Sequence, residues 1–360
     1  MRRLFVYSCN AAVLVLLLLS PTPAVETSGS ASAATMIPVR TAYQVQRWWL
    51  EVYIGEQRGW FTKMGLQLTG SSFASGAPEV AAGASGSWDI GGAGNIPALL
   101  GADRYGLESI AIADREESII TVMALGDKAS EYLKNPSLLK GKTIPVTTES
   151  TGQWGATACL EKKFHLAAND WHFVNLSPPE INAALSSGKY DVSEVWAPNT
   201  YTLESTIQAK VICTGKDVGL PITSNLFVTP NFAKEHPDAV AKFLAVYEHA
   251  VAWERIHPKD TERYLSAFYR KGGVQIPDQY LAQELRDRPA FDLAEQLNAM
   301  KTAPNGTSPF GDWMTQVGEF MKSVGTIAKV PDPKTYIVDK FMLMVENDPK
   351  LRSFAQGGRF

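Results

Sequence analysis

The chain has 360 residues, of which 45% are hydrophobic and 20% charged, and its net charge at pH 7 is −3. This slight acidic excess argues against nucleic acid or an anionic membrane surface as a partner, because both attract basic proteins. Chains longer than about 250–300 residues usually divide their hydrophobic core, so two lobes are expected.

The first 34 residues have the features of a cleaved secretory signal. Arg2 and Arg3 precede an apolar run from Ala11 to Leu19, and the small residues that follow end in the cleavage pattern Ala31-Ser32-Ala33. The apolar run is far shorter than the roughly 20 residues that span a bilayer, so a membrane anchor is the weaker interpretation. We therefore expect export with removal of residues 1–34.

Beyond this segment, short apolar strands alternate with helical patterns, which predicts parallel sheets built from strand–helix units. The predicted strands of the first series lie at 36–43, 66–72, 88–93, 107–114 and 118–125, with helices at 49–59, 77–85 and 96–103. A polar, lysine-rich surface connection over 125–142 precedes a second series. Its strands are predicted at 143–148, 171–176, 190–197 and 209–215, with helices at 150–166 and from Pro178 onward. The segment 231–360 has the periodicity of packed amphipathic helices.

One short unit occurs twice in the chain, as APEVAAGASGSWDIGG at 77–92 and as PPEINAALSSGKYDVSEVW at 178–196. Both copies begin with Pro-Glu, continue through an alanine-rich stretch to Ser-Gly, and end on aromatic-Asp-aliphatic. Chance is one explanation, because Pro-Glu starts and glycine ends are common to many helices. The matched ending favours two related lobes, each with a strand–helix–strand unit whose Ser-Gly ends the helix.

Two polar loops join a strand to a helix, GGAGNIPALL at 91–100 and TTESTGQWGATACL at 147–160. Backbone N–H groups at a helix N-terminus can bind an anionic or polar group. Open α/β sheets bind ligands at the carboxyl ends of their strands, so the two loops are predicted to face one cleft. Neither is a dinucleotide fingerprint or a P-loop, and a plain tight turn is the alternative for the first. Trp48, Trp49, Trp154 and Trp196 are candidates for the cleft wall.

The sequence favours neither a metal site nor a cofactor. Its five histidines show no ligand spacing, so buried or solvated histidines are the better interpretation. Cys159 and Cys213 remain after signal removal. An exported compartment permits a disulfide between them, but two singly buried cysteines are the favoured interpretation, and both alternatives stay open.

Four segments resemble solute-binding proteins of ABC transporters of the taurine, aliphatic sulfonate and nitrate type. These are IGEQRGWFTKMGLQLTGSSFASGAPEVAAGASGSWDIGGAGNIPALLGAD, ESTGQW, SSGKYDVSEVWAP and NFAKEHPDAVAKFL. The resemblance covers most of 37–255 and fades after it. It implies an α/β chain with a two-lobed periplasmic-binding-protein fold, each lobe a mainly parallel sheet flanked by helices and the ligand cleft between the lobes.

The resemblance also implies a division of the chain. Lobe I would take 35–125 and the mostly helical 226–360, and lobe II would take 126–225, with crossovers near 123–127 and 224–227. The implied ligand-binding residues are Gln44, Trp48, Ser75, Gly76 and Asn95 from lobe I, with Ser150, Thr151, Gln153 and Trp196 from lobe II. They would donate hydrogen bonds to an anionic or polar head group and pack aromatic rings on the rest of the solute.

Some positions depart from the family pattern. Gln153 and Trp154 stand where relatives often carry histidine and an aromatic residue, and Asn199 follows Trp-Ala-Pro without the usual acid. Charged residues of both signs could lie near the cleft, so the charge of the solute cannot be read from the sequence: Arg47, Arg115, Glu116, Glu149 and Glu194.

The implied function is capture of a small organic anion or zwitterion, such as a sulfonate, a carboxylate or a related nitrogen or sulfur compound. The protein would act in the periplasm as a monomer and deliver the solute to the transmembrane subunits of an ABC permease. One alternative is a sensory binding protein that presents its ligand to a receptor. Another is an enzyme like the fungal pyrimidine synthases that share this fold. That enzyme alternative is disfavoured, because those proteins supply a histidine and an iron site and no histidine here lies near either loop.

Overall fold

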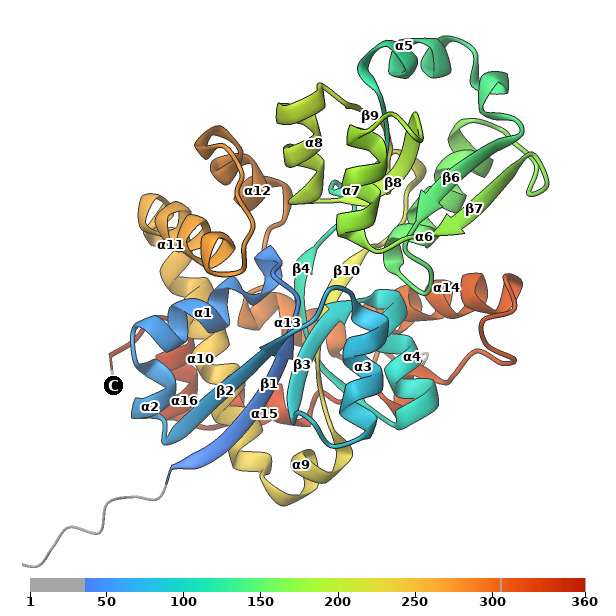
Figure 1. Cartoon of the computed structure of the whole chain (residues 1–360). Helices are drawn as coiled ribbons and strands as arrows, with labels where there is room; N and C mark the ends of the chain where they lie inside the picture. The colour runs from blue at the N-terminus through green and yellow to red at the C-terminus, as the bar shows by residue number, and fades with distance from the viewer. Residues whose placement is uncertain (1–35, 305, 360) are drawn as a thin grey trace, which may run out of the picture. The chain divides into compact units, whose positions relative to one another are not determined.

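A five-stranded sheet in the order β2-β1-β3-β10-β4 organises the computed structural model (Figure 1). The structure describes residues 36–304 and 306–359, so the predicted signal at 1–34 lies outside the described residues. The strands are β1 (Ile37–Tyr43), β2 (Leu66–Ser72), β3 (Ile90–Gly94), β4 (Glu108–Arg115) and β10 (Thr223–Val228). Strands β1, β2 and β3 are parallel, and β10 is antiparallel to both of its neighbours, β3 and β4.

The remaining strands form a second group, which with its helices makes up lobe II. Strand β5 (Ile120–Ala124) pairs antiparallel with β8 (Val192–Trp196) and β9 (Lys210–Thr214), and β6 (Lys142–Val146) pairs parallel with β7 (Trp171–Asn175). The reversed strands β5 and β10 are the ones that follow a passage of the chain between the groups. Each of these two strands enters its group from the side of the other lobe. The neighbouring strands have their carboxyl ends on that side, so the pairing is antiparallel.

Helices flank both groups of strands. Lobe I has α1 (Leu50–Gln57), α2 (Trp60–Lys63), α3 (Gly76–Ala84) and α4 (Asn95–Tyr105), and lobe II has α5 (Gly126–Lys134), α6 (Thr151–Ala158), α7 (Pro178–Ser186) and α8 (Asn199–Ile207). The C-terminal part contains α9 (Pro230–Glu235), α10 (Pro237–Ile256), α11 (Pro258–Lys271), α12 (Leu281–Asp287), α13 (Leu293–Met300), α14 (Pro309–Ser323), α15 (Lys340–Asn347) and α16 (Pro349–Ala355). Helix α10 is buried along most of its length and packs on α1, α15 and α16. Among the described residues, no helix is long and apolar enough to cross a membrane.

The predicted strands and helices are confirmed, but the prediction missed the strand β10 and three helices, the short α2 as well as α5 and α8. The segment 125–142, predicted as a surface connection, contains α5. This helix buries only Ala129 and Tyr132 within a mainly polar stretch, so its apolar stripe is too narrow to read from the sequence. Helix α8 begins directly after the cis peptide bond between Ala197 and Pro198 and carries the buried Tyr201.

The repeated unit of the sequence has the same local geometry in both places. Helices α3 and α7 each end at a serine followed by a glycine in the left-handed region, Gly86 (φ 73°) and Gly188 (φ 70°). The aspartate of each copy then pairs with a basic residue on another strand of its group, β1 or β6. Asp89 accepts from Nε of Arg40 on β1 at 3.0 Å, and Asp191 accepts from Nζ of Lys142 on β6 at 2.8 Å. These ion pairs give the aspartate of both copies the same role.

The chain passes between the two groups of strands through 116–119 and 215–222. These passages lie earlier than the crossovers predicted near 123–127 and 224–227, because the strand pairing of β5 starts at Ile120 and that of β10 at Thr223. The lobe boundaries at 125 and 225 stay a prediction.

Lobe II contains a disulfide between Cys159 and Cys213, with the Cα atoms 6.0 Å apart. The favoured sequence interpretation of two single cysteines is therefore wrong. Cys159 begins the turn that follows α6, and Cys213 lies on β9, next to that turn in space. A separation of 54 residues gives no hint of this proximity. The bond ties the end of α6 to the sheet of lobe II.

The double variant Cys159→Ser/Cys213→Ser should lower the free energy of unfolding by about 2–4 kcal/mol, because the bond closes a loop in the unfolded chain. Urea denaturation without reductant measures this change. Reductant should lower the free energy of unfolding of the wild-type protein and leave that of the variant unchanged. Equal unfolding midpoints for the oxidised wild type and the variant would contradict a stabilising disulfide.

Candidate ligand-binding site

A small cavity lies between the lobes, at the carboxyl ends of β1, β3 and β8. It is lined by Gln44, Gln46, Trp48, Gly76, Gly94, Pro97, Glu116, Ile120, Ser150, Thr151, Gly152 and Trp196. Its volume is about 30 Å³, enough for one or two water molecules but not for an organic solute. The structure therefore shows the two lobes closed on each other.

A contact across the cleft explains this closure. The hydroxyl Oγ1 of Thr151, at the start of α6, accepts a hydrogen bond from the backbone N–H of Ile96 in α4 at 3.2 Å. The side chain of Thr151 fills the space where a β-carbon on Gly94 would stand, so the lobes can approach this closely only with glycine there. At the rim, Arg104 of lobe I pairs with Glu149 of lobe II at 2.8 Å.

Three helices begin at the cavity, and their N-termini supply its positive potential. Helix α3 starts at Gly76, α4 at Asn95 and α6 at Thr151. In α3 and α4 the N-cap side chain accepts no hydrogen bond from the first N–H groups of the helix. In α6 the Ser150 hydroxyl does so, accepting from the Gln153 N–H at 3.2 Å. Free N–H groups at converging N-termini are suited to binding an anion.

Buried carboxylates lie behind these N-termini. Glu79 accepts from Gln44 Nε2 at 2.9 Å and from the Gly92 N–H at 3.0 Å, which fixes the Gln44 amide at the cavity wall. Burial raises the pKa of Glu79 to about 8, against these two hydrogen bonds. Burial also raises the pKa of Glu194 to about 8. Glu194 lies under α6, where a β-carbon on Gly152 would collide with its carboxylate.

Six of the nine residues predicted for the site line the cavity: Gln44, Trp48, Gly76, Ser150, Thr151 and Trp196. The other three do not line it, and two of them, Asn95 and Gln153, have their side chains engaged elsewhere. Asn95 accepts from the Thr223 N–H at 2.7 Å and donates to the Thr223 hydroxyl at 3.1 Å, which ties α4 to β10. Gln153 accepts from the Glu149 N–H at 3.1 Å, and Ser75 is the half-buried residue before α3.

The four candidate tryptophans divide evenly between cavity and core. Trp48 and Trp196 line the cavity. Trp49 stacks on Tyr43 with ring centroids 5.5 Å apart, and Trp154 packs against Phe320 of α14 at 6.2 Å.

Six lining residues were not among the nine: Glu116, named only as a charged residue that could lie near the cleft, and Gln46, Gly94, Pro97, Ile120 and Gly152. Gly94 and Pro97 lay in the glycine-rich loop that pointed to the site, and Gly152 lay in the second loop. No sequence signal marks Ile120, which looks like any core residue of a strand.

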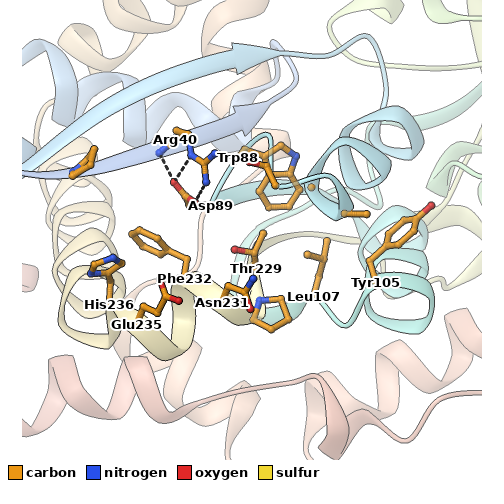
Figure 2. A pocket seen from close by; sticks show the side chains of 15 residues that line it. Arg40, Trp88, Asp89, Tyr105, Leu107, Thr229, Asn231, Phe232, Glu235 and His236 are labelled. Atoms are coloured by element: carbon orange, nitrogen blue, oxygen red, sulfur yellow. Dashed lines mark hydrogen bonds and ion pairs between the residues drawn. The ribbon is translucent and has the colours of Figure 1, made fainter.

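A larger cavity, of about 600 Å³, lies at the opposite edge of the five-stranded sheet (Figure 2). It is bordered by residues that precede β3 and β4 and by Thr229, which follows the antiparallel β10. Figure 2 shows Arg40 and Asp89 bound to each other on its wall, so their charges are already paired. Parallel sheets bind ligands at the other edge, where the small cavity lies. The small cavity is therefore the better candidate site.

The fold and the cleft define a class of protein, the two-lobed periplasmic binding proteins. The crystal structure of the periplasmic aliphatic sulphonate binding protein SsuA from Escherichia coli is similar in fold, with a TM-score of 0.67 and 17% identity over 84% of this chain and 92% of that one.

The sequence matches the family described as NMT1/THI5 like over residues 49–261, and the chain belongs to this family. The taurine-binding periplasmic protein of Escherichia coli (strain K12) is 30% identical over 77% of this chain and 84% of that protein. A Bacillus subtilis (strain 168) protein named for binding aliphatic sulfonates is 27% identical over 57% of this chain, and the match spans 62% of that protein.

Glu194 should make the stability of the protein depend on pH. The folded protein keeps this proton up to about pH 8, whereas an unfolded glutamate releases it near 4.3, so the free energy of unfolding should fall as pH rises between these values. In Glu194→Gln the decline should be shallower by up to about 1.4 kcal/mol per pH unit. Urea denaturation at several pH values from 5 to 8 measures both slopes. Parallel curves would mean that Glu194 is ionised in the folded protein.

Proposed function

We propose that this protein is an exported solute-binding protein that holds a small organic anion or zwitterion between its lobes and delivers it to the transmembrane subunits of an ABC importer. The observation that carries the proposal is the convergence of three helix N-termini on one cavity walled by Trp48 and Trp196. N-termini favour negative charge, and indole rings favour an organic body. The names of the taurine- and sulfonate-binding relatives point to the same class of solute.

Binding in this scheme requires the lobes to part and close again. The closed cavity is too small for a solute, so entry needs a hinge motion about the two passages, 116–119 and 215–222. In this closed arrangement the Thr151 hydroxyl accepts from the Ile96 N–H, a donor that an anionic group would otherwise use. A bound solute replaces this hydrogen bond and stays enclosed, and the permease then recognises the closed form.

We also propose that the protein is not an enzyme. The Ser150 hydroxyl donates to the Thr147 carbonyl oxygen at 2.6 Å and caps α6, so its proton is directed at a backbone oxygen and not at a base. None of the five histidines, all within the described residues, lines the cavity. The part of the chain that the structure describes also contains no cluster of three or more His, Cys, Asp or Glu side chains suited to a metal ion.

We further propose a periplasmic monomer without nucleic-acid partners. Net negative charge disfavours nucleic acid. The Escherichia coli relative is named as periplasmic. The signal-like first 34 residues fit export.

A thermal-shift screen of the mature protein with sulfonates, carboxylates, amino acids and nitrate tests this function. A solute at a hundredfold excess over its Kd should stabilise the folded state by about 2.7 kcal/mol and raise the melting temperature. No shift across the panel, with a folded protein, would contradict it.

Trp196→Ala should abolish most of the ligand-induced shift, because this ring lines the cavity. Trp171→Ala is the matched control, since Trp171 packs on Phe173 inside lobe II, away from the cleft. The control should lower the melting temperature of the free protein and keep the ligand-induced shift. An undiminished shift in Trp196→Ala would place the solute elsewhere.

A further inference from the structure

A fully buried arginine lies beside the cleft, between the lobe I sheet and α12. The guanidinium of Arg288 donates to Asp114 Oδ2 at 3.1 Å, to Glu284 Oε1 at 3.0 Å and to Glu116 Oε1. It also donates to the side-chain oxygen of Gln46 at 3.1 Å. One cation thus faces three carboxylates, from the end of β4, the first interlobe passage and α12.

A second buried arginine does not balance the negative charge of these three carboxylates, because it has two carboxylates of its own. Arg47 pairs with Glu51 at 2.5 Å and with Glu254 at 2.9 Å, and all three side chains are at least nine-tenths buried. Arg47 also interacts electrostatically with Asp114, so the two clusters form one charged region. The region holds five carboxylates and two guanidinium groups, which leaves an excess of three negative charges if every group is ionised.

Buried charge without a counterion is unfavourable, and the carboxylates respond to it. Burial raises the pKa of Asp114 and of Glu116, against the attraction of Arg288. Burial also raises the pKa of Glu254 to about 8, against the attraction of Arg47. The region therefore favours an additional positive charge, either a proton or a cation.

Glu116 is the one carboxylate of this region that lines the interlobe cavity. Arg288 holds its Oε1, and its Oε2 lies 3.6 Å from the point where a β-carbon on Gly94 would stand, at the floor of the cleft. The Glu116 side chain is only 7% exposed. A cation bound at Oε2 would sit in a largely desolvated place, where a charge-assisted hydrogen bond is strong.

We infer that the solute is a zwitterion whose ammonium group binds Glu116 while its anionic group binds the N-termini of α3, α4 and α6. This inference rests on the proposed function and specifies its substrate class. An anion alone would place more negative charge beside these buried carboxylates, whereas the ammonium of a zwitterion can pair with Glu116, the one that lines the cavity. Glu116 is thereby a specificity-determining residue, and Arg288 is the positioning residue that aims it.

Matched solutes that differ only in the amine test the inference in the unmodified protein. Calorimetric titration would compare taurine with 2-hydroxyethanesulfonate, and β-alanine with 3-hydroxypropanoate. In the pair with the preferred anionic group, the amine should bind tighter by about tenfold or more. Equal or tighter binding of the hydroxy analogues would overturn the inference and leave the proposed function standing. No binding by any of the four, or by the anions of the thermal-shift panel, would overturn both.

The variant Glu116→Gln separates charge recognition from structure, because glutamine keeps the shape and an oxygen for Arg288. It should weaken the amine by about tenfold and leave the hydroxy analogue unchanged or tighter. A purely structural role would weaken both solutes alike and would overturn the assignment. Glu235→Gln, at the rim of the opposite cavity, is the matched control and should change neither affinity. If Glu116→Gln does not fold, Glu116→Asp is the alternative. Its shorter side chain keeps the charge but moves it away from the cavity, so binding of the amine should weaken selectively.

Discussion

The arrangement of the described residues depends most on the ion pairs of the buried Arg288 guanidinium. The guanidinium joins the end of β4, the first interlobe passage and α12 through Asp114, Glu116 and Glu284. Glu284 also accepts from the Tyr201 hydroxyl of α8 at 2.8 Å, so the same cluster reaches lobe II. Without the guanidinium, three buried carboxylates would face one another. Removing one partner of a buried ion pair is strongly destabilising, because it leaves the other charge uncompensated. The C-terminal segment thus supports the cleft through Glu284 and Arg288, although the motifs that resemble the family fade after residue 255.

This cluster also sets the polarity of the cleft. Arg288 holds Gln46 and Glu116 at one side of the cavity, while the N-termini of α3, α4 and α6 converge on it from both lobes. One region thus presents negative charge and the other presents helix N-termini, within a space walled by two tryptophans. The separation of opposite potentials is a direct result of burying more carboxylates than guanidinium groups. Closure brings the two regions together, because the α6 N-terminus belongs to lobe II and Glu116 to the passage between the lobes.

The parts of this structure that depend on neighbouring residues were readable from the sequence. The strands other than β10 and the glycine-rich loops of 91–100 and 147–160 are local patterns, and these loops do meet at the cavity. What could not be read depends on distant partners. Asn95 was expected to face the solute, but its amide binds Thr223, 128 residues away. Arg288 and Gln46 are 242 residues apart, and nothing near either one indicates their contact.

A crystal structure of the protein with a stabilising solute tests the central claim most directly. The account predicts that the solute lies between the lobes and that its anionic group replaces the Thr151 hydroxyl at the Ile96 N–H. The Trp48 and Trp196 rings should contact the rest of the molecule. A solute found instead in the cavity beside Arg40 and Asp89, with the bond from Ile96 to Thr151 intact, would contradict the account.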